Sequence, residues 1–170
     1  ANPSVVKLWR NCEMAARTVI EEHRTVRLKN GIAFGYINGN LFIKLPSGRK
    51  LCYWNTHLTM DPRDGREHIV YMGVNQETKQ WGETETYGGK LVENITQAIA
   101  RDCLAISMQR VAALGYNIVM HVHDEMIVDV PIEDTDALER INACMGEAIP
   151  WAPGLPLRGD GYETPFYMKD

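Results

Sequence analysis

The chain has 170 residues, of which 45% are hydrophobic and 24% are charged, and this is the composition of an ordinary soluble globular protein. Its length allows one domain, residues 1–170, with a substantial hydrophobic core. No run approaches about 18 consecutive apolar residues, so a membrane-spanning helix is excluded.

The start of the chain and its cysteines favour the cytoplasm. The opening Ala-Asn-Pro-Ser lacks the charged and apolar regions of a signal peptide, so export is not expected. Because there is no initiator Met, we expect the chain to begin inside a longer protein or after processing. The four cysteines lie far apart without Cys-x-x-Cys spacing, which disfavours a zinc ribbon or a disulfide framework. We interpret them as small buried hydrophobes in a reducing compartment.

The net charge of −4 is unevenly distributed along the chain. Residues 1–50 hold nine Lys and Arg against three Asp and Glu, or +6, whereas residues 51–170 hold nine against nineteen, or −10. Phosphate contacts require Lys and Arg, so the basic first third could bind a nucleic-acid backbone and the acidic remainder argues against it.

An amphipathic helix is predicted in the segment 1–27. Asn2 suits the N-cap and Pro3 the first helical position, and apolar residues recur at helical spacing as far as residue 27. The opposite face is basic, and both a solvated surface and a phosphate-binding surface remain open for it.

Residues 31–86 then predict a small antiparallel meander, because the apolar period changes to two. Asn38-Gly39 is typical of a type I′ hairpin turn. Further turns are predicted at residues 46–48 and 61–65.

A long helix is predicted from about Lys90 to Leu114 and is closed by Gly115. One side of it is apolar. Another side carries a polar stripe of amides and charges: Lys90, Glu93, Asn94, Gln97 and Arg101. Most such stripes face water, but amides mixed with charges also suit hydrogen bonding to a ligand.

After this helix, residues 116–123 and 126–130 predict two strands joined by a tight reversal at Asp124-Glu125. A third helix, capped by Asp134 or Thr135, is predicted to run to about Ile149, and an irregular aromatic tail follows. The fold class is therefore α+β: an antiparallel sheet that contains this hairpin is packed by long helices, and the N-terminal meander is additional.

The stretch His121-Val122-His123-Asp124-Glu125 carries the most distinctive chemistry. Adjacent carboxylates repel each other, and Mg²⁺ or Mn²⁺ would relieve that repulsion. Two alternatives remain: acids that simply face water, and a metallohydrolase in which His121 and His123 on one strand face bind zinc.

Taken in order, several segments resemble family A (DNA polymerase I-like) DNA polymerases of phages. Val-His-Asp-Glu at residues 122–125 resembles motif C of that family, and Tyr-Gly-Gly-Lys-Leu-Val-Glu-Asn-Ile-Thr-Gln at residues 87–97 resembles the palm helix before it. Leu-Pro-Ser-Gly-Arg at residues 45–49, Trp-Ala-Pro-Gly-Leu-Pro at residues 151–156 and Asp-Gly-Tyr at residues 160–162 also match. The likeness covers most of the chain in the correct order.

The resemblance implies a role for each matching residue. Asp124 would bind the catalytic Mg²⁺, for which Mn²⁺ can substitute, and Glu125 would support it. His123 would contact the primer end and Gln97 the minor-groove side of the duplex. Further DNA-contacting residues implied with a less certain alignment are Asn94, Lys90 and Arg101.

The family's motifs A and B, which supply a second aspartate and the nucleotide-gripping Lys and Tyr, are absent from this sequence. We therefore expect a C-terminal palm fragment of a template-directed DNA polymerase that is inactive alone. Its partners would be primer-template DNA and dNTPs in a bacterial host cytoplasm, with no membrane. Self-association of the fragment is left open. A non-catalytic binding module that kept the palm fold is the competing hypothesis.

Overall fold

The structure is a computed structural model that describes residues 2–62, 64–75 and 77–167. Contacts divide the chain into two compact units, residues 1–99 and 100–170. The single domain expected over residues 1–170 stays a prediction. Helices and antiparallel strands are both present, which confirms the predicted α+β class.

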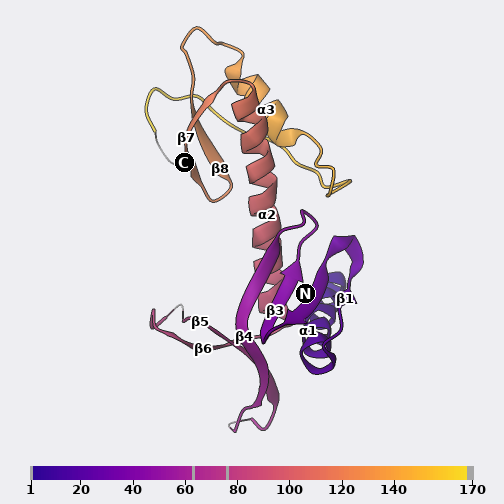
Figure 1. Cartoon of the computed structure of the whole chain (residues 1–170). Helices are drawn as coiled ribbons and strands as arrows, with labels where there is room; N and C mark the ends of the chain where they lie inside the picture. Colours follow the sequence, from indigo (N-terminus) through magenta and orange to yellow (C-terminus); the bar gives the residue numbers. More distant parts are fainter. Residues whose placement is uncertain (1, 63, 76, 168–170) are drawn as a thin grey trace. The chain divides into compact units, whose positions relative to one another are not determined.

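The first unit is built on a six-stranded antiparallel sheet in which neighbours in sequence are neighbours in space, in the order β1-β2-β3-β4-β5-β6 (Figure 1). This is the predicted meander. Its elements are α1 (Pro3–Glu22), β1 (Val26–Arg27), a short 3₁₀ turn η1 (Lys29–Gly31), β2 (Ala33–Ile37), β3 (Asn40–Lys44), β4 (Lys50–Met60), β5 (Glu67–Val74), β6 (Trp81–Thr86) and the first part of α2 (Gly88–Ala113).

Helix α1 begins as predicted but ends five residues earlier than expected. The side chain of Asn2 accepts a hydrogen bond from the Ser4 backbone N–H, and Pro3 is the first helical residue. At the other end His23 adopts a left-handed conformation (φ 56°) and its N–H bonds the Val19 carbonyl. A left-handed residue ends a helix, so the prediction to residue 27 is wrong and Val26 instead pairs with Phe34 in the sheet.

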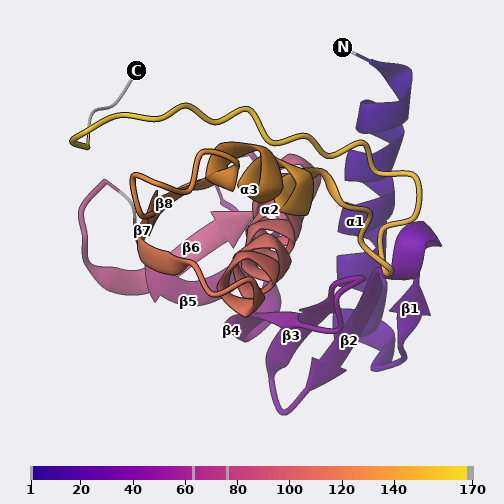
Figure 2. The ribbon, with the colours of Figure 1, turned by 90° about the horizontal axis from the view of Figure 1, so that it is seen from above.

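The core of the first unit lies between α1, the sheet and α2, and α1 packs along β1, β2 and β3 (Figure 2). The predicted alternation is confirmed, because Phe34, Leu41, Ile43 and Leu45 are all fully buried. The hairpin turn is also confirmed, since Asn38 and Gly39 both have positive φ (49° and 79°), as a type I′ turn requires.

Strand β4 fills most of the stretch between the two predicted turns at residues 46–48 and 61–65, and it belongs to two parts of the sheet. A register shift lies between Trp54 and His57, where Asn55 has positive φ. Such a bulge bends a strand, and β5 and β6 extend away from β1–β3 (Figure 1). The predicted break at residues 61–65 joins β4 to β5, with residue 63 outside the described residues.

The second unit, residues 100–170, contains the rest of α2, a separate two-stranded hairpin and a short helix. Its further elements are β7 (Asn117–Val122), β8 (Glu125–Asp129) and α3 (Ala137–Gly146). The buried residues of this unit are Cys103, Leu104, Ser107, Val111, Ala137 and Ile149.

Helix α3 is shorter than predicted at both ends. Asp134 does not cap it, because that carboxylate instead accepts hydrogen bonds from the Tyr116 hydroxyl and from Arg140. Helix α3 therefore starts at Ala137, and at Glu147 the backbone is already extended. The tail then packs back on α3, where Asn142 accepts a hydrogen bond from the Gly161 N–H at 3.0 Å.

The cysteines follow the prediction only in part. All four are free thiols. Cys12 and Cys103 are buried, and burial raises the pKa of Cys12 to about 11. Cys144 is half-buried, but Cys52 is exposed on the sheet, so its predicted burial is wrong.

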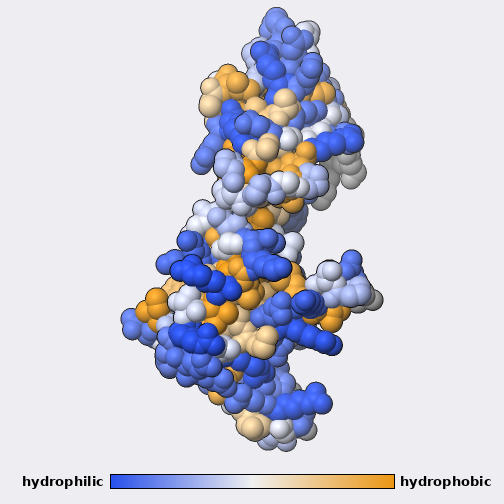
Figure 3. Space-filling model, turned by 90° about the vertical axis from the view of Figure 1, so that its right-hand side faces the viewer, coloured by the Kyte–Doolittle hydropathy of each residue, from blue (hydrophilic) through white to orange (hydrophobic). Residues whose placement is uncertain are grey.

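Apolar side chains also reach the surface. Figure 3 shows apolar patches among polar surface on the face that it draws. Exposed apolar residues of the first unit include Trp54 and Trp81, and those of the second unit include Val119 and Met120. Over the described residues, none of the helices is both long and apolar enough to cross a membrane.

Candidate functional site: the β7–β8 turn and the α2 stripe

The predicted carboxylates lie at the turn of the β7–β8 hairpin. Val122 pairs with Glu125, which leaves His123 and Asp124 as the two turn residues. The reversal was predicted at Asp124-Glu125 and is thus one residue earlier, with Glu125 as the first residue of β8. Apolar residues on both strands hold the turn at the end of the hairpin.

The backbone at this turn is unusual. His123 has φ 50°, in the left-handed region that few residues other than glycine adopt. Glycine or asparagine would fit such a turn at lower cost, so a histidine here carries strain on the order of 1–3 kcal/mol. Strain of this kind is frequent at functional sites. The left-handed backbone also orients the imidazole differently from a residue in a regular strand.

A second irregularity lies on β7, the strand that leads into the turn. The pairing of β7 with β8 shifts register between Ile118 and Met120, which makes Val119 a bulge. Val119 is 56% exposed and Met120 is 42% exposed. Bulges are frequent next to active sites because they redirect the residues that follow.

The three polar side chains of the turn are available for a ligand. His123, Asp124 and Glu125 are all exposed. Within the described residues, none of these side chains takes part in a hydrogen bond or an ion pair. Two adjacent carboxylates and an imidazole are thus presented together to solvent, an arrangement that can accept a cation or contact a polar substrate.

His121 is engaged differently from His123. Its Nε2 lies 3.3 Å from Nη2 of Arg101, and a guanidinium can only donate, so this nitrogen is the acceptor. The metallohydrolase hypothesis needed both imidazoles on one face of a strand. That premise is wrong, because β7 ends at Val122 and His123 belongs to the turn.

The polar stripe predicted on α2 is present, and its side chains differ in their partners. Lys90 is paired with Glu93 at 3.0 Å, and Gln97 is exposed. Asn94 donates a hydrogen bond of 2.8 Å to the hydroxyl of Tyr53, whose pKa is raised by burial. Asn94 thus has an internal structural role, and its contact with DNA stays a prediction.

Gln97 lies on the wall of a shallow open groove in the first unit. The groove is lined by Trp9 of α1, by Tyr87, and by residues on the first turns of α2 that include Glu93 and Gln97. Tyr87 is 61% exposed and Trp9 is 39% exposed. Two aromatic faces beside an amide can contact sugars and base edges, which suits a nucleic acid more than it suits an ion.

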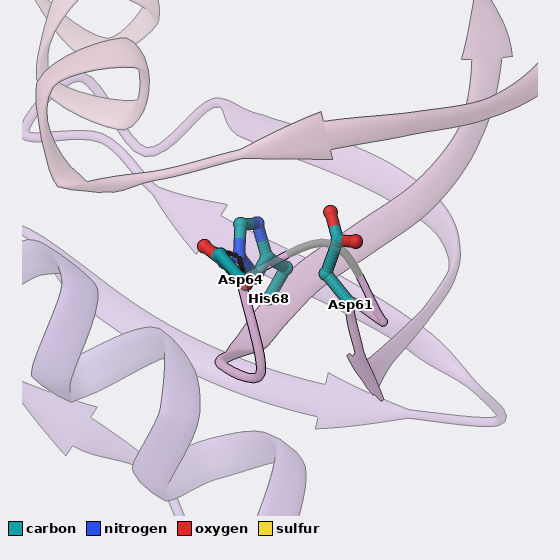
Figure 4. Close-up of side chains that lie close together, drawn as sticks. All are labelled: Asp61, Asp64 and His68. Atoms are coloured by element: carbon teal, nitrogen blue, oxygen red, sulfur yellow. Dashed lines mark hydrogen bonds and ion pairs between the residues drawn. The ribbon is translucent and has the colours of Figure 1, made fainter.

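A cluster that sequence reasoning did not identify lies on the β4–β5 hairpin. Asp61, Asp64 and His68 place their ligand atoms within 4.8 Å of one another, and no other group of three metal-ligating residues occurs in the described part of the chain (Figure 4). The signal available in the sequence was the Asp-x-x-Asp-x-x-x-His spacing across a turn.

Local hydrogen bonds set the charges in this cluster. The backbone N–H of Arg66 holds the pKa of the Asp64 carboxyl below its usual range, and the bond to Asp64 raises the pKa of His68. The negative charge of Asp61 partly opposes this lowering of the Asp64 pKa. Two carboxylates therefore repel each other beside one imidazole.

Comparison with known proteins agrees with the resemblance carried by these motifs. No protein-family profile and no solved structure matches the chain. A DNA polymerase of Bacillus phage SP02 is 49% identical to the chain over all 170 residues, and the chain spans 26% of that protein's length. The predicted resemblance is confirmed at this level: the whole chain is similar to about a quarter of a phage DNA polymerase.

Proposed function

We propose that the chain is the C-terminal part of the palm of a phage-type family A DNA polymerase. In this proposal Asp124 is the metal-binding catalytic carboxylate and Glu125 supports it. The observation that carries the proposal is the 49% identity over the entire chain to a phage DNA polymerase. The exposed turn that presents both carboxylates supports it.

The residues of the turn suit the cation that the family uses. Mg²⁺ prefers hard oxygen ligands and keeps several waters, so it is commonly held by one or two protein carboxylates together with substrate phosphates. Asp124 and Glu125 supply such carboxylates, and the remaining ligands would come from other parts of the polymerase. When bound, Mg²⁺ would assist attack by the primer 3′-hydroxyl and stabilise the leaving pyrophosphate.

The side chains around the turn would position the substrates. His123, held in the left-handed conformation, would contact the primer end. Gln97 would approach the duplex from the minor-groove side, beside the aromatic walls of its groove. Lys90, Asn94 and Arg101 are further proposed DNA contacts, of which Arg101 also fixes His121.

The net charge of −4 sets a limit on what the chain does by itself. Affinity for DNA comes mainly from Lys and Arg on phosphates. We therefore infer that the isolated chain binds primer-template DNA weakly and does not extend it, and that the rest of the polymerase supplies the electrostatic contacts and the missing carboxylate. The reaction would take place in the cytoplasm of a bacterial host.

A chimaera tests this proposal. The chain would replace the matching 170 residues of the phage SP02 protein, and primer extension with Mg²⁺ and four dNTPs would be followed on a gel. The unsubstituted chimaera is expected to extend the primer, and Asp124→Asn is expected to abolish extension because an amide is a poor ligand for Mg²⁺.

The matched control lies on the same hairpin. Asp129 is an exposed carboxylate at the other end of β8, so Asp129→Asn makes the same chemical change away from the turn and is expected to leave extension intact. Full activity in Asp124→Asn would overturn the assignment of this carboxylate. An inactive but folded chimaera that still bound DNA would favour the non-catalytic binding module.

A further inference from the structure

The β4–β5 hairpin carries three metal-ligating side chains: one just after β4, one in the turn and one on β5. Asp61 follows the last residue of β4, Asp64 lies in the turn and His68 is on β5. Figure 4 shows Asp64 and His68 facing each other, with the Asp61 side chain beside the pair. Nothing in the proposed polymerase reaction uses these residues.

The spacing of the ligand atoms suits one small cation. Nε2 of His68 lies 3.1 Å and 3.3 Å from the two carboxylate oxygens of Asp64. Ligands bound about 2.1 Å from a tetrahedral ion lie about 3.4 Å from one another. The ligand atom of Asp61 lies within 4.8 Å of those of both partners, so all three side chains face one point.

The other ring nitrogen of His68 is held by a carboxylate of a different strand. Nδ1 of His68 lies 3.2 Å from Oε2 of Glu85, which is on β6. Histidines that bind metals through one nitrogen usually donate the other N–H to a carboxylate, which fixes both the tautomer and the ring orientation. Here that arrangement directs Nε2 toward the Asp64 carboxylate, and a bound ion would replace the Nε2 proton between these two groups.

Burial and charge favour a cation at the same point. Asp61 is only 7% exposed, and its carboxylate lies within 4.8 Å of that of Asp64, so the two negative charges repel each other. With Glu85, three carboxylates surround one imidazole. A divalent cation between Asp61 and Asp64 would lower this repulsion, and a histidine ligand selects zinc-like ions over Mg²⁺.

We propose that Asp61, Asp64 and His68 form a binding site for a zinc-class divalent cation, with Glu85 as the residue that positions His68. The site has three protein ligands and an open position for water, and its bound ion would link the end of β4 to β5. The bound ion stabilises the β4–β5 hairpin. The site does not involve the carboxylates at the β7–β8 turn.

The test is a calorimetric titration of Zn²⁺ into the chelator-treated 170-residue chain. His68→Gln and Asp64→Asn are each expected to weaken the tight binding by more than about 100-fold, and Glu85→Gln by about 10- to 100-fold. His57→Gln is the matched control, because His57 is also a sheet histidine beside a glutamate, with Nε2 3.6 Å from Glu83, yet lies outside the cluster. It is expected to leave the affinity unchanged.

Histidine ring resonances in the unsubstituted chain provide a readout that does not depend on how the variants fold. At one equivalent of Zn²⁺, the His68 ring is expected to shift first and to show Nδ1 as the protonated nitrogen. First shifts at His121 or His123, or an affinity that His68→Gln leaves unaltered, would overturn the proposal. Asp124→Asn should leave this binding unchanged, so failure of the polymerase assignment is distinguishable from failure of the zinc site.

Discussion

Six described residues other than glycine adopt a left-handed backbone, and one of them, His123, lies at a candidate site. His123 accepts a left-handed backbone at the β7–β8 turn, where the hairpin rule predicted a glycine-containing dipeptide. The family resemblance implies a DNA contact for Asn94, which stays a prediction, and in the structure its amide donates a hydrogen bond to Tyr53. A sequence shows which face of a helix is polar, whereas the partner of a given amide depends on a strand 41 residues away.

Two adjacent glycines at the start of α2, Gly88 and Gly89, differ in the space available for a side chain. A Cβ at Gly88 would lie 2.1 Å from the backbone carbonyl oxygen of Trp9, whereas one at Gly89 would meet mainly the ring of Tyr87, which is exposed and free to move. We predict that Gly88→Ala lowers the free energy of unfolding by about 2–3 kcal/mol, because α1 must shift.

Gly89→Ala is the control for this prediction, and urea denaturation of the two variants measures the difference. Gly89→Ala is expected to change the free energy of unfolding by less than about 1 kcal/mol, since the gain in helix propensity offsets the displacement of Tyr87. Equal effects of the two substitutions would show that α1 and α2 do not pack as closely as described.

At the scale of elements, α3 depends on an interaction that a local reading of the sequence does not reveal. The guanidinium of Arg110, on α2, donates hydrogen bonds to the carbonyl of Cys144 in the last turn of α3 and to those of Glu147 and Ala148 directly after it. The last carbonyls of a helix have no partner within it, and a cation there also offsets the helix dipole.

We predict that Arg110→Met lowers the stability of α3 by about 1–3 kcal/mol. Faster hydrogen exchange of the α3 amides would measure this. Arg158→Met is the control, because Arg158 pairs with Asp160 on a fully accessible surface where ion pairs contribute little. Unchanged exchange in Arg110→Met would mean that α3 is held by its apolar contacts alone.

The sequence predicted which elements form better than where they end. The meander, α2 and the β7–β8 hairpin were predictable because their apolar periodicity and their Asn-Gly and Gly-Gly signals are local. The end of α1 was not, because a histidine rather than a glycine takes the left-handed position. The start of α3 was missed for a different reason, since the expected cap, Asp134, is bonded to Tyr116 and Arg140.

The candidate sites were predictable to different degrees. The carboxylates of the turn could be identified from adjacent acids between two apolar strands, although their register was one residue out. Asp61, Asp64 and His68 could not be grouped from sequence alone, because it takes the β4–β5 pairing and Glu85 of β6 to bring the ligands together.

At the scale of the whole molecule, the chain is similar to part of a phage DNA polymerase. It spans 26% of the phage protein to which it is similar, and its own acidic residues outnumber its basic ones. Under the proposed function, binding of DNA therefore belongs to the longer protein, and the contribution of α2 has to be measured there.

The Gln97 groove yields a prediction at this scale. In the chimaera, Gln97→Ala is expected to weaken binding of a primer-template duplex by about five- to tenfold, the loss of a single hydrogen bond. Fluorescence anisotropy would measure it. Gln109→Ala, an exposed glutamine further along α2, should bind as the parent does. An equal loss in both variants would remove the reason for assigning the groove to DNA.

The central claim, that Asp124 is a catalytic carboxylate, is tested most directly by single-turnover incorporation of one nucleotide. The chimaera would be saturated with primer-template DNA and dNTP, so that only the chemical step is compared. The account predicts that Asp124→Asn binds DNA as tightly as Asp129→Asn but incorporates no measurable nucleotide. Equal incorporation rates in the two variants would contradict it.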